Sequence, residues 1–381
     1  MDSPVKKASH FLKDVVTFLD YALFRLLSGF DASVPPMDVK RILVVERLFM
    51  GDLIVITPVF RALKKKYPDA KIDVLIQPSM VDVLSGNPFL SEIIPVSDSD
   101  LKNAGKVVNQ LKGKYGLGVI LNYGTYNISK ILRDAGIPYR VGATKAGFLT
   151  GRGFFLHRKT RPCFGIKHKV EHHMDVVRSI GIDVADKHLE VFIPKDARKA
   201  VDKLLKFKKD DFVVAVHAAP AHKTHQWYAD RFAHVADILI GKYNARIVFT
   251  GAEKDKSIVE SIRSLMKNDS VSAVGKTSIK EYFALIDRAD LLISVDTSAM
   301  HVGSAVGTPV IALFGAGNPL MWRPYGSQHI VIYKIRGCTG CLRHSCLFRN
   351  GACMRAIRVG DVLNAVETIL SGKKGVVSNA S

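Results

Sequence analysis

The chain is 381 residues long, 48% of its residues are hydrophobic, and its formal net charge is +20 at pH 7. This length exceeds one ordinary core and predicts two domains, and the hydrophobic content excludes a disordered chain. The positive charge favours an anionic partner, unless the basic surface serves only solubility. Nucleic acid is not the expected partner, because the basic residues are dispersed and no zinc-finger or RNA-recognition signature occurs.

The first segment, residues 1–36, is expected to form an amphipathic leader helix. Within it, residues 9–30 carry apolar side chains at helical spacing. Charged residues interrupt this run and exclude a signal-peptide core, and no apolar run in the chain is long enough to cross a membrane. Two interpretations stay open: the helix packs on the body of the protein, or it lies on an anionic membrane surface with the help of Lys6, Lys7 and Lys13.

Residues 37–194 are predicted to form a first α/β domain, because strand-like apolar runs alternate with helix-like segments. A Gly-rich, basic segment at 143–173 is expected to be a loop with little core. The predicted strands are 41–46, 71–77, 93–96, 117–121 and 139–142, and the predicted helices are 52–67, 81–86, 101–114, 128–135 and 170–180. Such alternation is typical of a parallel sheet.

Residues 211–372 repeat the alternation after a charged stretch that marks the boundary. The predicted strands are 212–217, 246–250, 271–274, 291–295 and 310–314, and the predicted helices are 229–241, 255–267, 278–287 and 299–306. Two successive doubly wound halves of similar length predict two Rossmann-like domains that face each other across a cleft.

The most informative stretch is 291–315, which predicts a tight strand–helix–strand unit. Its helix begins at residue types that cap helices and ends before a Gly and a Pro. A helix N-terminus at the carboxyl edge of a parallel sheet binds phosphate through free N–H groups and the helix dipole. We therefore predict a nucleotide or nucleotide-sugar site. The residues assigned to it are Asp296, Thr297, Ser298, Met300 and His301, with Gly315 and Gly317 giving a ligand close access to the backbone.

A second candidate site follows the first predicted strand. Gly51 permits close approach of the backbone to a ligand, and Asp52 begins the next predicted helix. A carboxylate in this place can take a proton from an attacking hydroxyl group. The alternative is that Asp52 only caps its helix.

A third candidate site is the loop from His217 to Trp227. Lys223, with His222 and His225, places positive charge near the strand ends of the second domain. A cation there can stabilise a leaving diphosphate. The alternative is an ordinary basic loop.

Four cysteines lie close together near the end of the chain, with the spacing C-x2-C-x4-C-x6-C. Four thiolates at such spacing can bind one structural zinc ion tetrahedrally. The alternatives are reduced thiols, or two disulfides formed on oxidation. The four residues are Cys338, Cys341, Cys346 and Cys353.

With these residues in place, the chain resembles the ADP-heptose:lipopolysaccharide heptosyltransferases of glycosyltransferase family 9, from about Arg41 to Leu370. The resemblance depends on several blocks that occur in the same order. The blocks are RILVVERLFMGDLIVITPVFRALKKKYPDAKIDVLIQP, GNPFLSEII, HKVEHHMDVVRSIGI and ISVDTSAMHVGSAVGTPVIALFG, and the late Cys cluster also recurs in the family.

The resemblance implies a GT-B fold, with an N-terminal acceptor domain and a C-terminal nucleotide-sugar domain. It also implies inverting transfer of a heptose from an ADP-activated donor, with no cofactor or metal required. Asp52 matches the catalytic carboxylate of the family. The residues that match its donor-diphosphate turn are Asp296, Thr297, Ser298 and His301.

Two places depart from the family pattern. Where the family has Lys two residues before the Trp of Lys-x-Trp-Pro, this chain has His225, with Lys223 two residues earlier and Tyr228 in place of the Pro. Either Lys223 reaches the diphosphate, or His225 contributes to binding it. The donor turn also carries Ser298-Ala299-Met300 where Gly-Leu-Ser is common in the family.

The resemblance gives the basic surface a specific partner, a phosphorylated lipid A–core acceptor. The expected acceptor-binding residues are Gly51, Arg61 and Lys64. The alternative is that Arg61 and Lys64 only form a solvated face of their helix. The enzyme is expected in the cytoplasm, peripheral on the inner face of the cytoplasmic membrane. Two other functions stay open: a GT-B transferase of another nucleotide sugar, and a non-catalytic nucleotide-binding module at a membrane surface.

Overall fold

The structure is a computed structural model. It describes residues 35, 38–122, 126–143, 155–160, 167–208, 210–220, 222–334 and 352–372. The predicted leader helix, most of the predicted loop at 143–173, and three of the four clustered cysteines lie outside these residues. Among the described residues, no helix is long and apolar enough to cross a membrane.

The chain divides into two compact units. Unit 1 comprises Met1–Val81, Asn87–Phe164 and Lys169–Lys187, and unit 2 comprises Asp82–Gly86, Gly165–His168 and His188–Ser381. Each unit is built around one six-stranded sheet. The predicted α/β class with two Rossmann-like sheets is therefore confirmed, while the predicted domain limits at 37–194 and 211–372 stay predictions.

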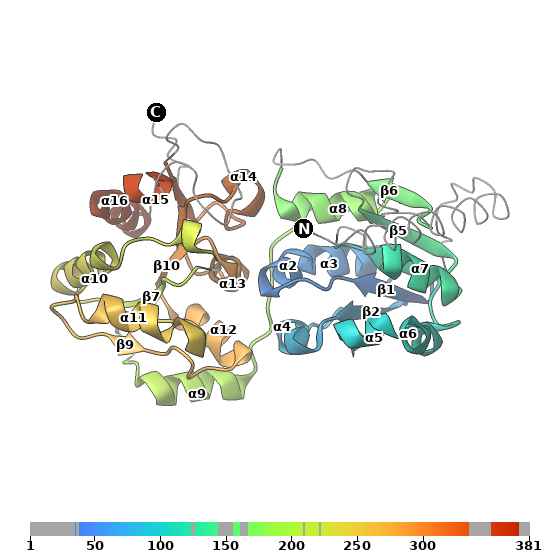
Figure 1. Ribbon diagram of the computed structural model, residues 1–381, viewed down its shortest axis with the longest axis horizontal. Helices are drawn as coiled ribbons and strands as arrows, with labels where there is room; N and C mark the ends of the chain where they lie inside the picture. The colour runs from blue at the N-terminus through green and yellow to red at the C-terminus, as the bar shows by residue number, and fades with distance from the viewer. Residues whose placement is uncertain are drawn as a thin grey trace, which may run out of the picture. The chain divides into compact units, whose positions relative to one another are not determined.

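The sheet of unit 1 is parallel throughout, with the strand order β3-β2-β1-β4-β5-β6 (Figure 1). Its four central strands are largely apolar and almost fully buried, as expected when helices cover both faces. The edge strand β3 is mostly exposed or half-buried. The strands are β1 (Arg41–Val45), β2 (Lys71–Ile76), β3 (Glu92–Pro95), β4 (Leu117–Ile120), β5 (Tyr139–Ala143) and β6 (Arg158–Thr160).

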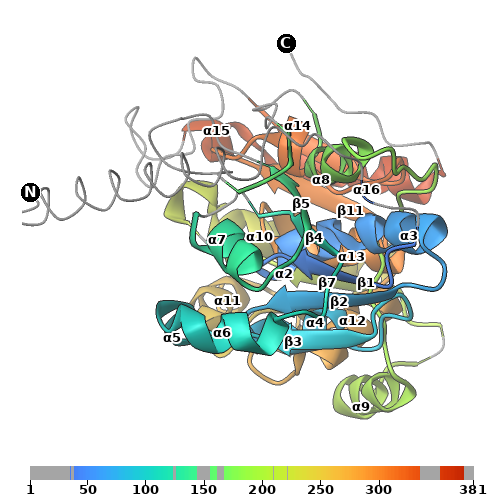
Figure 2. The same ribbon diagram turned by 90° about the vertical axis from the view of Figure 1, so that its right-hand side faces the viewer.

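Helices cover both faces of this sheet (Figure 2). Helix α3 (Thr57–Lys66) packs against α8 (Lys169–Arg178) on one face, and α6 (Ala104–Leu111) packs against α7 (Tyr126–Asp134) on the other. The shorter elements are α2 (Met50–Val55), η1 (Pro78–Met80), α4 (Val81–Leu84) and α5 (Asp98–Lys102).

The single helix predicted at 52–67 is wrong, because the chain forms two helices, α2 and α3, that meet at Ile56. Pro58 has no N–H group with which to continue the helical hydrogen bonds. The hydroxyl of Thr57 instead donates to the carbonyl of Ile54 at 2.8 Å. Helix α2 begins at Met50, so Gly51 and Asp52 lie in its first turn.

The sheet of unit 2 is also parallel, with the order β12-β11-β10-β7-β8-β9. Read from its other edge, the order is β9-β8-β7-β10-β11-β12, which repeats the order of unit 1 when the strands of each sheet are numbered from its own first strand. The strands are β7 (Val213–His217), β8 (Arg246–Phe249), β9 (Val271–Ser272), β10 (Leu291–Val295), β11 (Val310–Phe314) and β12 (Ile330–Tyr333).

The helices of unit 2 include several that the sequence analysis did not predict. The predicted ones are α10 (Ala229–Tyr243), α11 (Lys256–Arg263), α12 (Ile279–Arg288) and α13 (Ser298–Val306). The others are α9 (Lys195–Leu205), α14 (Pro319–Trp322), α15 (Ala352–Ala356) and α16 (Val359–Leu370), with the short turns η3 (Lys223–His225) and η4 (Glu253–Asp255). Helix α9 lies where the sequence analysis expected a domain boundary. It was not predicted because its sequence is mostly charged, with only a narrow stripe of buried apolar side chains.

A buried carboxylate joins three elements of unit 1. Asp73 on β2 is 0% exposed and accepts hydrogen bonds from Arg41 Nε at 2.6 Å and from the hydroxyl of Tyr115 at 2.9 Å. Burial and the hydrogen bond to this carboxylate both disfavour the phenolate of Tyr115, so they raise its pKa. The guanidinium of Arg41 also pairs with Glu92, whose side chain is 54% exposed.

We expect Asp73→Asn to lower the free energy of unfolding by about 2–4 kcal/mol, because the buried guanidinium contact loses its charged partner. Urea unfolding followed by circular dichroism measures the loss. The matched control is Glu92→Gln, which removes the exposed partner of the same arginine and should cost less than about 1 kcal/mol. Equal losses in the two variants would contradict the importance of the buried contact.

Candidate active site

Each sheet has one place where the chain changes its winding direction. In unit 1 it lies between β1 and β4, and in unit 2 it lies between β7 and β10. Doubly wound sheets bind ligands outside the carboxyl ends of the two strands at such a place. The three loops singled out in the sequence follow β1, β7 and β10, so the topology brings each of them to one of these two places.

Asp52 lies in the first turn of α2, directly after the loop that follows β1. Its Oδ2 accepts a hydrogen bond from the backbone N–H of Phe49 at 3.3 Å, so the residue does cap its helix. The side chain nevertheless stays partly exposed. Gly51 beside it is buried. Capping and proton transfer are compatible, because a carboxylate has two oxygens and several lone pairs.

The electrostatic surroundings of Asp52 suit a base. Burial raises the pKa of Asp52 above its usual value, while the charge of Lys169 and the backbone N–H groups of Phe49 and Asp52 lower it in part. A raised pKa makes a carboxylate a stronger base near neutral pH. The sequence analysis did not assign Lys169, which lies in α8 and is 1% exposed.

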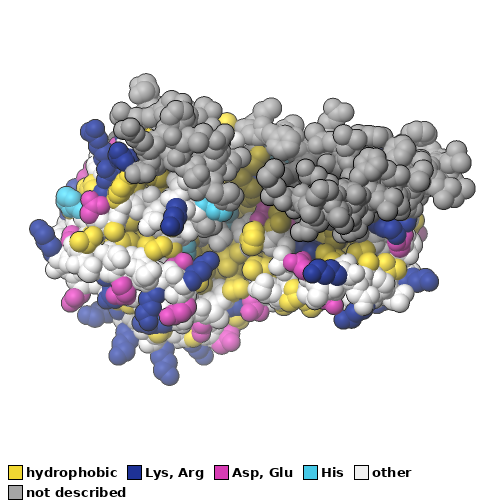
Figure 3. Space-filling view, viewed as in Figure 1, with side chains coloured by type: hydrophobic (Ala, Val, Ile, Leu, Met, Phe, Trp, Pro, Cys, Tyr) yellow, Lys and Arg dark blue, Asp and Glu magenta, His cyan; other side chains and the backbone are white. Residues whose placement is uncertain are grey.

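The two basic residues expected at the acceptor side make contacts within unit 1. Arg61 donates to the carbonyl of Asp186 at 3.0 Å, and its guanidinium lies 5.9 Å from the ring centroid of Phe89. Lys64 donates to the carbonyl of Ala70 at 3.0 Å, at the end of α3 that lies away from Asp52. Figure 3 shows Lys and Arg side chains dispersed among Asp and Glu over the visible face rather than gathered in one patch. Their acceptor role stays a prediction.

The turn after β10 forms the N-terminus of α13, as predicted. Thr297 is the N-cap residue, and its Oγ1 accepts from the backbone N–H of Ala299 at 3.3 Å. The partly exposed residues of this turn are Asp296, Thr297 and Ser298, whereas Met300 and His301 are 1% and 3% exposed. The first three are therefore the side chains that a ligand can reach directly.

Asp296 pairs with a histidine of the loop after β7. Its Oδ2 lies 3.2 Å from Nδ1 of His225, and both side chains are largely buried. Lys223, two residues earlier in η3, is exposed. The structure thus brings His225, rather than Lys223, to the carboxylate of the donor turn. The Nε2 atom of an imidazole lies on the opposite side of the ring from Nδ1.

His301 is neutral at physiological pH. Burial, with a smaller contribution from the nearby imidazoles of His168 and His329, lowers its pKa to about 3. Its ring lies 6.0 Å from that of Trp322, and its Nδ1 has no hydrogen-bond partner among the described residues. This histidine can donate or accept one hydrogen bond, but it does not supply positive charge to a diphosphate.

Gly315 and Gly317 let the loop after β11 lie close against the turn. A Cβ at position 317 would collide with the carboxylate of Asp296. A Cβ at position 315 would lie 2.8 Å from Met354 and 2.9 Å from the carbonyl of Thr224. Both glycines are therefore required by packing around the turn.

Glu253 is a candidate site residue that the sequence analysis did not identify. It begins η4 after β8, the second strand of its sheet, and its side chain lies against Gly275, which has a φ of +68°. An acidic residue that follows the second strand of a Rossmann-type sheet commonly accepts hydrogen bonds from ribose hydroxyls. A Gly-Ala-Glu sequence directly after an apolar strand is the signal that could have found it.

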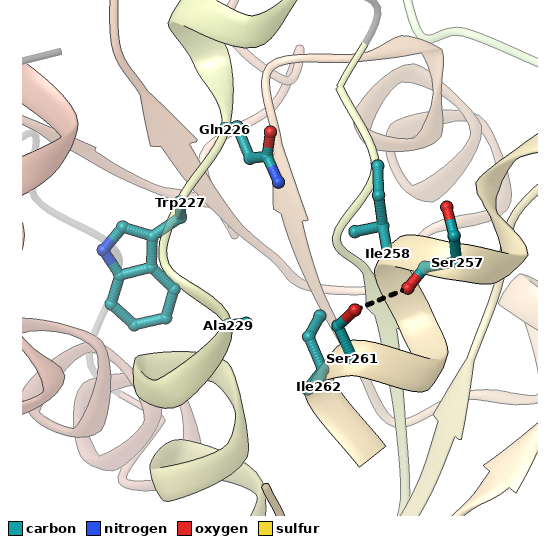
Figure 4. A pocket seen from close by; sticks show the side chains of 7 residues that line it. All are labelled: Gln226, Trp227, Ala229, Ser257, Ile258, Ser261 and Ile262. Atoms are coloured by element: carbon teal, nitrogen blue, oxygen red, sulfur yellow. Dashed lines mark hydrogen bonds between the residues drawn. The ribbon is translucent and has the colours of Figure 1, made fainter. Parts of the chain in front are cut away.

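A pocket of about 160 Å³ lies beside the His225 loop (Figure 4). Its lining comes from the segment before α10 and from one face of α11, where Ser261 donates to the carbonyl of Ser257 at 2.8 Å. The lining residues are Gln226, Trp227, Ala229, Ser257, Ile258, Ser261 and Ile262. No charged group lines it, so this pocket does not fit a diphosphate.

The zinc prediction is not tested. Cys338, Cys341 and Cys346 lie outside the described residues, and Cys353 is partly buried in α15. Within the described ranges, no group of His, Cys, Asp and Glu side chains is arranged to hold a metal ion.

Two doubly wound parallel sheets, each with polar loops at its switch point, are the architecture of the GT-B fold. The sequence pattern of glycosyltransferase family 9 (heptosyltransferase) matches residues 105–351. The chain belongs to this family and is a glycosyltransferase. The predicted family and enzyme class are confirmed.

Individual relatives agree with the family. The chain is 28% identical over 338 residues to lipopolysaccharide heptosyltransferase 3 of Escherichia coli, covering 84% of this chain and 97% of the relative. It is 26% identical over 297 residues to the lipopolysaccharide core heptosyltransferase OpsX of Haemophilus influenzae, covering 77% and 84%.

Solved structures share the fold. A family 9 glycosyl transferase from Veillonella parvula matches with a TM-score of 0.77 and 25% identity, over 89% of this chain and 99% of that one. The ADP-heptose lps heptosyltransferase II of E. coli matches with a TM-score of 0.72 and 19% identity, over 87% and 99%.

We expect Gly317→Ala to weaken nucleoside diphosphate binding by about tenfold or more, because displacement of Asp296 disturbs a charged, buried contact. Calorimetric titration with ADP measures the change. The control is Gly241→Ala in α10, where a Cβ has open space and should leave affinity unchanged. Unchanged affinity in the Gly317 variant would show that Asp296 does not need its observed position.

Proposed function

We propose that the protein transfers a heptose from ADP-heptose to a lipopolysaccharide core acceptor, with inversion at the anomeric carbon. Membership of family 9 is the observation that carries the proposal. Its support also includes relatives described as lipopolysaccharide heptosyltransferases and a fold match to E. coli heptosyltransferase WaaC with ADP. The Asp52 turn in unit 1 and the Asp296 turn in unit 2 supply groups for the acceptor and the donor.

Asp52 acts as the general base in this proposal. Its carboxylate takes the proton of the acceptor hydroxyl while the hydroxyl oxygen forms a bond to the anomeric carbon. The bond from that carbon to the diphosphate oxygen breaks, and the electron pair leaves with the diphosphate. Burial raises the pKa of Asp52, which strengthens it as a base.

The donor diphosphate is held by the N-terminus of α13 and by the basic loop after β7. An unpaired Asp296 would repel a diphosphate, and its pairing with His225 offsets that charge. His225 then presents Nε2 to the phosphate oxygens, in the place where the family has a lysine. Lys223 is exposed and supplies further positive charge.

Other parts of the donor have candidate partners in unit 2. Glu253 accepts hydrogen bonds from the ribose hydroxyls. Ser298 is partly exposed at the start of α13 and donates to the phosphate. These groups, with His225 and Lys223, allow transfer without a resident metal ion, as the resemblance implies.

The acceptor is a phosphorylated lipid A–core saccharide in this proposal, and the net charge of +20 suits it. Gly51 lies beside the base, and Arg61 and Lys64 would have to exchange their observed contacts for acceptor phosphates. The enzyme would work in the cytoplasm, peripheral on the inner face of the cytoplasmic membrane. Contact with an anionic membrane surface fits the dispersed basic residues.

Two departures from the family pattern favour a second candidate, a transferase that uses another nucleotide sugar. His225 and the Ser298–Met300 segment differ from the family pattern, and both lie where the donor would bind. Titration with ADP-, UDP- and GDP-sugars separates the two candidates. Absence of both transfer and donor hydrolysis would instead favour a non-catalytic nucleotide-binding module.

We expect Asp52→Asn to reduce kcat by about 10²-fold to 10⁴-fold, because the amide cannot take the proton of the acceptor. ADP affinity should stay near normal, since Asp52 lies in unit 1. A coupled assay of ADP release measures turnover. The control is Asp98→Asn, which removes an exposed carboxylate of the same unit. A loss below about tenfold would show that Asp52 is not the base.

We expect His225→Ala to raise the donor KM by about tenfold to a hundredfold, because Asp296 loses its partner beside an anionic ligand. His225→Lys should keep most of the affinity, since an ammonium group can also pair with the carboxylate of Asp296. Lys223→Gln should cost less than His225→Ala. A larger effect at Lys223 would mean that the exposed lysine, and not the histidine, holds the diphosphate.

A further inference from the structure

A buried carboxyl group without an assigned role lies beside the proposed base. Glu46 directly follows β1 and is 0% exposed. Its Oε1 accepts a hydrogen bond from the backbone N–H of Leu48 at 3.1 Å, and its Oε2 has no hydrogen-bond partner among the described residues. An ionised carboxylate in such a place would carry an uncompensated cost of desolvation.

The groups around Glu46 favour its protonated form. Burial and the negative charge of Asp52 raise the pKa of Glu46 to about 8, while Lys169 and the backbone N–H groups of Leu48 and Arg47 lower it in part. Since Asp52 acts on Glu46 as a charge, Asp52 is the carboxyl group that ionises first. Two carboxyl groups that share one site ionise in separate steps for this reason.

Among the described residues, the side chains next to Glu46 on the neighbouring elements are neutral or are held by other partners. The guanidinium of Arg47 is directed to Asp98 at 2.7 Å and to the carbonyl of Val96 at 3.1 Å. On the side of β2, Gln77 donates to the carbonyl of Arg47 at 2.7 Å. On the side of β4, Asn122 is buried and neutral. The charged groups that face Glu46 are therefore Asp52 on α2 and Lys169 on α8.

We propose that Glu46 is a positioning residue for the transfer reaction, which keeps its proton at working pH so that Asp52 alone carries the negative charge that Lys169 balances. The proposal deepens the proposed function and depends on Asp52 being the base. One carboxylate and one ammonium group leave this part of the site neutral. Loss of the second proton would leave it negative, and it would then repel an anionic acceptor.

The protonation itself is tested by carbon-13 NMR of the full chain labelled at the glutamate carboxyl groups. We expect one resonance with a midpoint near pH 8 that is absent from Glu46→Gln and unchanged in the surface control Glu92→Gln. In Asp52→Asn its midpoint should move to lower pH, because one cause of the shift is removed. A wild-type spectrum with no glutamate that titrates above about pH 6 overturns the proposal.

Thermal unfolding gives a second measure that needs no activity. A carboxyl group with a raised pKa in the folded state adds stability below its unfolded value, near 4.5, and that stability is lost as the pH rises through about 8. Wild-type Tm should therefore fall between about pH 4.5 and pH 8 more steeply than the Tm of Glu46→Gln. Parallel curves for the two proteins would contradict a buried, protonated Glu46.

The effect on the reaction is tested by the pH dependence of kcat/KM. Wild type should show an alkaline fall with an apparent pKa near 8, and Glu46→Gln should move that fall upward by at least one pH unit. Glu92→Gln should keep the wild-type profile. The same profile in Glu46→Gln overturns the positioning role. Absence of transfer in every variant, with the NMR titration intact, overturns the proposed function and not the protonation of Glu46.

Discussion

The strand order is the constraint on which the site depends. In each unit the chain leaves the two central strands toward opposite edges of the sheet, so the loops after those strands diverge and leave room at the carboxyl edge. The loop after β1 carries Glu46 and Asp52, and the loops after β7 and β10 carry His225 and Asp296. Glu46 and Asp52 are near neighbours in the sequence, whereas His225 and Asp296 are far apart, and the parallel pairing of β7 with β10 brings the loops of the second pair to a common edge.

In each unit, few contacts hold the charged side chains near the carboxyl ends of the strands. Asp296 lies at the N-terminus of α13, where we propose that an anion binds, and its Oδ2 lies 3.2 Å from Nδ1 of His225. Asp52 is kept from full hydration, which raises its pKa, and Lys169 moderates that effect. His301 is neutral, so the positive charge that a diphosphate requires has to come from His225, Lys223 and the dipole of α13. The turn after β10 in unit 2 therefore pairs Asp296 with His225, and the Asp52 turn in unit 1 places a carboxylate near the charge of Lys169.

The sequence predicted what local patterns determine. Strands such as β1 and β10 are continuous apolar runs, and α13 begins at cap residues, so both the elements and the position of the donor turn follow from neighbouring residues. The helix α9 and the break at Ile56 were missed because they depend on a narrow buried stripe and on one proline within an apolar run. Glu46 and Lys169 were missed for another reason: each has an ordinary local sequence, and only its burial makes it unusual. Glu253 has a local signal, the Gly-Ala-Glu sequence after an apolar strand, that was not used.

The same distinction explains why residue types alone do not settle the chemistry of this site. Met300 and His301 match a donor turn by position, yet both are buried, and the pKa of His301 is far below neutral. His225 departs from the family pattern, yet it occupies the place where its ring contacts Asp296. A substitution of lysine by histidine there exchanges a flexible, permanently charged group for a planar one whose orientation depends on its carboxylate partner. Donor binding in this chain should accordingly depend on Asp296 and His225 as a unit, and the removal of either residue should impair the other.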